Sequence, residues 1–290
     1  MFSTLFKAKP ILDEESKEWI FDTFAWCLDQ LDGDFFQTES VLILPNNSFY
    51  PGSSTSVEEM AGTIFSNTSK YTGMTSWPIR LVSAENFNPK PIPQLSFESS
   101  LRGENARVSI HENLQVSGEL SYKVEGDKLV SSNSMIDIPF HSSQLNQPQD
   151  LIAYLVQIEA GILVNQKGGT PYSIDAPGGK DVLAQTIDLV ACFMGFGVIF
   201  ANTAYQFKGG CGSCNNRSLN RQPALPELET VYALALFCVM KSVDIKPIKK
   251  ELKSHLYKPF RQAYKEISLY LQQTTNPAHA LLVVAESTST

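Results

Sequence analysis

The segment Leu189–Ala201, LVACFMGFGVIFA, is the most apolar stretch of the chain and decides how it folds. It extends to Phe207 only by accepting the polar residues Asn202, Thr203 and Gln206. A membrane-spanning helix needs about 20 consecutive apolar residues, and this segment falls short of that length. The pattern therefore favours a buried core helix over a membrane span.

Further helices are expected on both sides of this segment. Asp13 is placed to cap a helix that stops at Gly33, and Ser56 begins a capping pattern for a helix that stops at Gly73. In the second half, helical periodicity covers Leu151–Val164, Asp181–Phe207, Glu227–Val243 and Phe260–Leu271. Pro259 should break or start the last of these helices, because its ring removes a backbone donor.

Short β-prone runs occur within the first group of helices and between the two groups. Val41–Leu44 is a short apolar run closed by Pro45, which predicts a buried strand. From Trp77 to Phe140, several β-prone runs are separated by polar turns, as in an antiparallel meander. The fold class is therefore α+β, with a mixed α/β portion at 1–145, a helical portion at 146–273 and a flexible tail at 274–290.

Composition excludes several classes of function. The chain has 290 residues, 43% of them hydrophobic, which is enough for a large core. A formal net charge of -7 argues against nucleic acid as a partner. The first ten residues lack the apolar stretch of an export signal, and the cysteine count of five is odd. We therefore expect a cytoplasmic protein with reduced thiols.

Two acidic residues and one amide interrupt apolar helices. Glu159 must be partnered, exposed to solvent or functional, because an unpaired buried carboxylate is costly. Asp188 has either a structural role near a helix N-terminus or a contact with a metal or substrate. Asn202 needs hydrogen-bond partners if it is buried.

The glycine-rich loop after the apolar segment contains Cys211 and Cys214 in a CxxC arrangement. One such pair is a weak signal, since structural zinc sites usually have four ligands. Inert thiols, a metal site and a redox role all stay open. Arg217 and Arg221 flank the loop, and they are either solvated or clamp a carboxylate or phosphate.

Five stretches, spread over about residues 12 to 270, carry a resemblance to other proteins: Val41–Pro45 with Phe49–Pro51, Gly73–Leu81 (GMTSWPIRL), Asp150–Val164, Thr186–Phe207 and Arg221–Phe237. Together they resemble a family of uncharacterised bacterial proteins regarded as zinc metallopeptidases of the HExxH, zincin-like type. The resemblance implies that the helix at Leu151–Val164 carries the metal-binding motif and that Asp188 is the third ligand.

The motif itself is degenerate in this chain. Gln157, Ile158 and Gly161 stand where the family has His, Glu and His. Zinc hydrolysis of this type needs both histidines for the metal and the Glu to activate water. The resemblance thus implies the fold but not the activity, and no cofactor is expected, with zinc as the alternative.

Three functions follow, in order of preference. The first is a non-catalytic relative that binds a peptide or protein partner in the former active cleft, with Gln157, Gly161, Asn202, Arg217 and Arg221 as candidate cleft residues. The second is an active metal-dependent, peptidase-like hydrolase that uses Glu159 and Asp188, with Cys211 and Cys214 as further metal ligands. The third is a redox or metal-sensing module built on the CxxC loop.

Overall fold

The most apolar segment forms a broken helix in the middle of the molecule. The structure, a computed structural model, describes residues 10–52, 56–110, 122–124, 129–131, 135–167, 176–204, 221–276, 279 and 282. Helix α5 (Leu183–Ala191) continues through a π-helical turn, η4 (Cys192–Phe196), into α6 (Gly197–Thr203). Every residue from Asp188 to Thr203 is buried. The predicted core helix is confirmed, but it is not continuous.

The break lies at Gly195, whose φ is +96°. A Cβ at this position would lie 2.1 Å from the carbonyl oxygen of Val41, so no larger residue fits. The backbone N–H of Ile43 donates to the Gly195 carbonyl at 2.9 Å. Val41–Leu44 is therefore not the strand that we predicted. The backbone of Val41 and Ile43 lies against the helix break, and the side chains of residues 42–44 are buried.

Two helices in the N-terminal half begin where the capping patterns predicted. Asp13 accepts a hydrogen bond from Ser16 N at the start of α1, and Ser56 accepts one from Glu59 N at the start of α3. Gly73 ends α3 with a φ of +75°. The other described helical elements are α1 (Glu14–Gln30), α2 (Gly33–Thr38), α3 (Val57–Thr72), η1 (Ala84–Asn86), η2 (Ser142–Asn146), α4 (Pro148–Lys167), η3 (Gly179–Val182), α7 (Glu227–Met240), α8 (Ile248–Glu251) and α9 (Ser254–Gln273).

Pro259 does not break or start the last helix, contrary to our prediction. Helix α9 begins at Ser254 and runs through Pro259 to Gln273. Proline costs a helix one hydrogen bond, here to the carbonyl of His255 near the helix start. The buried residues Phe260 and Ile267 anchor α9 in the core and offset that loss.

In the part of the chain that the structure describes, the strands pair in three separate two-stranded ladders instead of one antiparallel meander. Strands β2 (Leu95–Phe97) and β3 (Val108–Ile110) are antiparallel, as are β4 (Tyr122–Val124) and β5 (Leu129–Ser131). However, β1 (Ile79–Ser83) and β6 (Ile136–Phe140) run parallel. Periodicity along one strand carries no information on the direction of its partner, so the prediction failed at this point.

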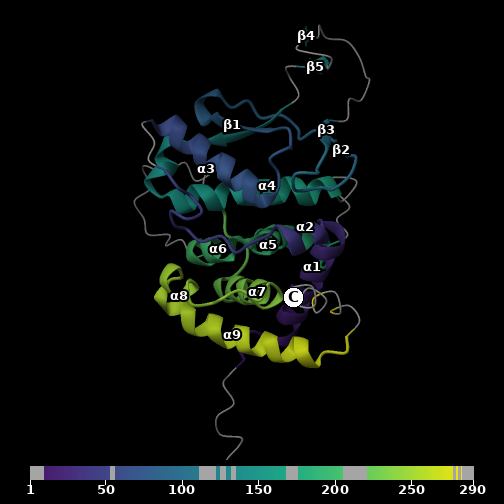
Figure 1. The fold of residues 1–290 in the computed structure, drawn as a ribbon, viewed down its shortest axis with the longest axis vertical. Helices are drawn as coiled ribbons and strands as arrows, with labels where there is room; N and C mark the ends of the chain where they lie inside the picture. Colours follow the sequence, from purple (N-terminus) through teal and green to yellow (C-terminus); the bar gives the residue numbers. More distant parts are fainter. Residues whose placement is uncertain are drawn as a thin grey trace, which may run out of the picture.

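Figure 1 shows these elements in layers. Helices α3 and α4 lie next to β1, α5 and α6 form the next layer, and α7 packs between that layer and α9. The mixture of helices and small sheets confirms the α+β composition. Both predicted portions contribute to one hydrophobic core. Within the expected loose tail, His279 and Leu282 are buried, so the expectation fails at those two residues.

The segment Gly179–Thr203 is long and apolar enough, by length and composition alone, to cross a membrane. No second segment of the described chain meets that criterion. In its most apolar window, 72% of the residues are buried in the fold, which is the environment of a core helix.

Candidate functional site

Asp188, the residue to which the resemblance assigns a metal, is fully buried on α5 and surrounded by donors. Its Oδ2 accepts hydrogen bonds from Arg221 Nη2 at 2.9 Å and from the backbone N–H groups of Ala224 and Leu225 at 2.9 and 3.1 Å. Its Oδ1 accepts one from Gln157 Nε2 at 2.8 Å. Both carboxylate oxygens therefore have partners within the chain.

Arg221 is the counter-ion of Asp188, and its side chain is only 1% exposed. Its Nη1 donates to the Phe200 carbonyl at 3.0 Å and to Thr203 Oγ1 at 2.7 Å. The guanidinium also lies over the Phe200 ring, 3.9 Å from the centroid. Of the two interpretations of this arginine, the structure supports the carboxylate clamp, and the carboxylate belongs to its own chain.

Gln157 completes what we call the Gln157–Asp188–Arg221 network. Its Nε2 also donates to the Gln222 carbonyl at 3.0 Å, and its Oε1 accepts from Gln222 N at 3.2 Å. One turn further along α4, a Cβ on Gly161 would lie 3.6 Å from Ile187 Cδ1, so this position faces α5. The network thus holds residues 221–225, which precede α7, against helices α4 and α5.

The residues of this network do not fit a zinc ion. Gln157 directs an amide N–H at Asp188, Gly161 has no side chain, and Arg221 brings a positive charge to the only carboxylate. Zinc sites use imidazole, thiolate and carboxylate ligands, usually four in number. In the part of the chain that the structure describes, no three His, Cys, Asp or Glu side chains are grouped to hold a metal.

Glu159 is also fully buried, but it lies against α3. Its carboxylate accepts hydrogen bonds from Ser69 Oγ at 2.8 Å and from Thr72 Oγ1 at 2.6 Å. Burial raises the pKa of Glu159 to about 7, although both hydrogen bonds act in the opposite direction. The interpretation of Glu159 as a solvent-facing residue is therefore wrong, and its partners come from another helix.

The structure does not bring Glu159 and Asp188 together as a catalytic pair. Residues two apart on an α-helix point about 200° apart, so Gln157 and Glu159 leave α4 on nearly opposite sides. Asp188 contacts Gln157, whereas the hydrogen-bond partners of Glu159 are on α3. Their carboxylates share no hydrogen-bond partner among the described residues.

Of the remaining candidate residues, one has a structural role and three lie outside the described residues. Asn202 donates to the Glu251 carbonyl at 2.8 Å and accepts from Lys253 N at 2.9 Å, so it holds the connection between α8 and α9. This places it in the core instead of a binding cleft. The candidates Cys211, Cys214 and Arg217 lie outside the described residues.

A groove runs between helix α4 and strand β6. It has a volume of about 450 Å³ and is lined from α4 by Tyr154, Ile158 and Ile162. Residues 135–139 and 87–93 contribute most of the opposite wall. We call this cavity the α4–β6 groove. Ile158, which stands at the Glu position of the resemblance, lies in it, whereas Gln157 and Gly161 face α5 and are not part of its described lining.

Sequence reasoning missed the hydroxyl partners of Glu159, although a signal for them exists. Met60 and Ile64 mark the buried stripe of α3, and the same four-residue spacing continues to Thr68 and Thr72. Hydroxyl groups on a buried stripe need a polar partner within the core. A buried acid on a neighbouring helix is such a partner.

Comparison with known proteins yields no relative of this chain. No protein-family model, no curated protein and no solved structure matches it. A relation to zincin-like metallopeptidases consequently rests on the residues quoted for it alone.

Proposed function

We propose that the protein is a non-catalytic relative of zincin-like metallopeptidases that binds an extended peptide segment of a partner protein in the α4–β6 groove. The observation that carries this proposal is the engagement of both oxygens of Asp188 by Arg221, Gln157 and two backbone N–H groups. A carboxylate that is saturated by its own chain is a poor ligand for a catalytic ion.

The composition of the groove supports a peptide as the occupant. Its walls are mainly aliphatic and aromatic, and Ile92 and Met135, which are 47% and 41% exposed, lie in its lining. Large apolar side chains that are exposed together along a groove mark interaction sites. They would accept the apolar side chains of a partner segment.

The backbone of β6 supports an extended conformation for that peptide. Among the described residues, β6 pairs only with β1, and the N–H of Ile136 donates to the Pro78 carbonyl at the junction with β1. Backbone groups of successive residues point to opposite edges of a strand, so those of Asp137 point away from β1. An edge strand of this kind binds a peptide by strand addition, with side-chain pockets providing specificity.

The three described free cysteines support a location inside the cell. Cys27, Cys192 and Cys238 are buried, and burial raises the pKa of each thiol. Such thiols behave as small hydrophobic side chains and need no disulfide partner.

The test is selection of phage-displayed random peptides on the immobilised full-length protein. We expect enriched sequences with apolar residues at alternate positions and no cleavage of the bound peptides. Met135→Asp and Ile92→Asp should weaken binding by about tenfold or more. Leu269→Asp is the matched control, since Leu269 is 57% exposed on α9, and it should bind as the wild type does.

Two results would overturn this function. One is the absence of any enriched peptide that depends on Met135 and Ile92. The other is hydrolysis of peptides by the purified protein that is lost in Glu159→Gln, which would support the carboxylate hydrolase. Light scattering measures the oligomeric state, and a dimer in solution would indicate that a second copy of the chain covers the groove instead of a peptide.

A further inference from the structure

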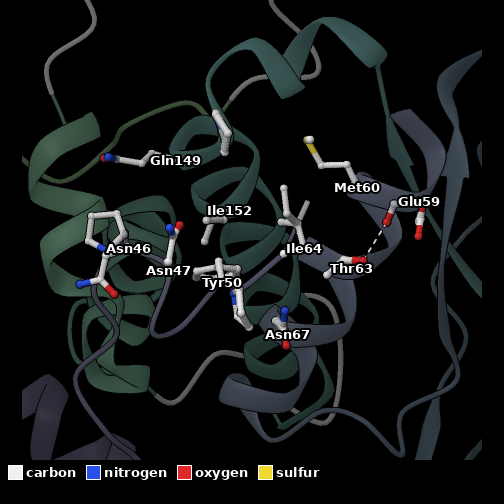
Figure 2. A pocket seen from close by; sticks show the side chains of 14 residues that line it. Asn46, Asn47, Tyr50, Glu59, Met60, Thr63, Ile64, Asn67, Gln149 and Ile152 are labelled. Atoms are coloured by element: carbon white, nitrogen blue, oxygen red, sulfur yellow. Dashed lines mark hydrogen bonds between the residues drawn. The ribbon is translucent and has the colours of Figure 1, made fainter. Parts of the chain in front are cut away.

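A second cavity lies near the N-terminal end of helix α4, among residues that the proposed function does not use. It has a volume of about 350 Å³ and lies between residues 45–52, helix α3 and the first turns of α4 (Figure 2). This volume is in the range of about 300–1,000 Å³ that is typical of ligand pockets. We call this cavity the amide pocket, and none of its lining residues lines the α4–β6 groove.

Three carboxamide side chains from separate segments line the amide pocket. Asn47 comes from the loop after the apolar run, Asn67 from α3 and Gln149 from the first turn of α4. None of the three side chains has a hydrogen-bond partner among the described residues. Each carboxamide offers two donors and one acceptor oxygen. By contrast, the fourth amide, Asn46, donates to Glu251 Oε1 and accepts from Ser48 N.

Apolar side chains form the rest of the pocket surface. Figure 2 shows Ile64, Ile152 and Tyr50 together near the middle of the cavity. The Tyr50 hydroxyl is 3.3 Å from Thr68 Oγ1, and this contact fixes its ring at the pocket wall. A ligand in the pocket therefore meets aliphatic and ring surfaces as well as amide groups.

The charges around the pocket restrict the ligand further. Among the described residues that line the pocket, Glu59 alone is charged, and it is exposed. The described part of the lining contains no Lys, Arg or His, the side chains that bind phosphates and carboxylates. An anionic ligand would therefore find an acid and no counter-ion. The pocket thus fits an uncharged ligand with many hydrogen-bonding groups.

We propose that the amide pocket binds an uncharged polyol of the size of a mono- or disaccharide. Hydroxyl groups both donate and accept, so they match the free carboxamides of Asn47, Asn67 and Gln149. The C–H faces of a sugar ring pack on Ile64, Ile152 and the Tyr50 ring. A nucleobase fits less well, because bases stack between aromatic or guanidinium planes, and the described residues of the lining include one aromatic ring.

Saturation-transfer NMR on the full-length protein tests this assignment. The probes are neutral mono- and disaccharides, the corresponding sugar phosphates and purine nucleosides. We expect saturation of one or more neutral sugars and none of the phosphates. Loss of an amide partner should weaken binding about tenfold in Asn67→Ala or Gln149→Ala. Gln37→Ala, an exposed amide on α2, is the matched control and should bind unchanged.

The outcomes that overturn the proposal are distinct. They are the absence of saturation for every neutral sugar, binding restricted to phosphates or nucleosides, and sugar binding that neither pocket variant weakens. Circular dichroism of both variants establishes that a loss of binding does not reflect unfolding. Peptide binding in the α4–β6 groove is a separate property, because its residues are different.

Discussion

Asp188 Oδ2 and Arg221 Nη2 lie 2.9 Å apart, and neither side chain is more than 1% exposed. Removing either charge would leave the other buried without compensation, and this costs more than the pair contributes as a unit. The pair therefore fixes the segment that leads into α7 onto α5. In the structure, both oxygens of Asp188 accept hydrogen bonds from the protein itself.

Substitution of Asp188 should strongly destabilise the protein. We expect Asp188→Ala to lower the free energy of unfolding by about 3–5 kcal/mol, because Arg221 stays buried without its counter-ion. Urea denaturation measures the change. The control is Asp137→Ala, which removes an ion pair with the half-exposed Arg80 and should cost about 1 kcal/mol or less. Equal losses in the two variants would contradict the structural role of Asp188.

Glu159 should make stability depend on pH. Its pKa is about 7 in the folded protein against an ordinary value of 4.5. Because the folded state holds the proton more tightly, the stabilising contribution is complete below about pH 4.5 and is lost as the pH rises through 7.

The variant Glu159→Gln removes this titration and keeps an acceptor for the hydroxyl groups of α3. We expect its stability relative to the wild type to increase between pH 5 and pH 8, by up to about 3 kcal/mol. Urea denaturation at each pH gives the difference. A difference that is constant across this range would show that Glu159 does not titrate there.

The helix break at Gly195 should tolerate no side chain. We expect Gly195→Ala to cost about 3 kcal/mol or more, because its φ is +96° and the new Cβ would meet the carbonyl oxygen of Val41. Gly62→Ala on α3 is the matched control, since nothing lies within 4 Å of its Cβ position. This control should gain about 0.5–1 kcal/mol. Thermal unfolding compares them, and a harmless Gly195→Ala would contradict the packing at the break.

Restoring the motif tests the resemblance to metallopeptidases. We expect Gln157→His, Ile158→Glu and Gly161→His together to confer zinc binding only when Arg221→Met frees Asp188 from its ion pair. Zinc titration monitored by calorimetry compares the triple and quadruple variants. If the quadruple variant binds no more zinc than the wild type, α4 is not the counterpart of a metallopeptidase helix.

Local interactions could be predicted from the sequence. Asp13 and Ser56 cap their helices through bonds to residues three positions later, so both ends of such a contact lie within one short window. The buried apolar helix was also predictable, because composition alone favours burial of that segment. The break at Gly195 was not, since it depends on the distant residue Val41.

The hydrogen-bond partners of Glu159 and Asp188 depend on packing between segments that are far apart in the sequence. The sequence identified Glu159 and Asp188 as acids in apolar helices, and burial made partners necessary. Which groups serve as partners is decided by how α3 and the segment at Arg221 pack on α4 and α5. The α4–β6 groove and the amide pocket likewise form only where segments that are distant in the sequence pack together, so the sequence alone does not predict them.

The zinc content of the full-length protein, measured by elemental analysis after purification without chelators, tests the central claim most directly. The Cys211→Ser, Cys214→Ser variant excludes a contribution from the CxxC loop. We predict that this variant carries far less than one zinc per chain, because Arg221 and Gln157 occupy the oxygens of Asp188. About one zinc per chain that survives in this variant and disappears in Asp188→Ala would contradict the account.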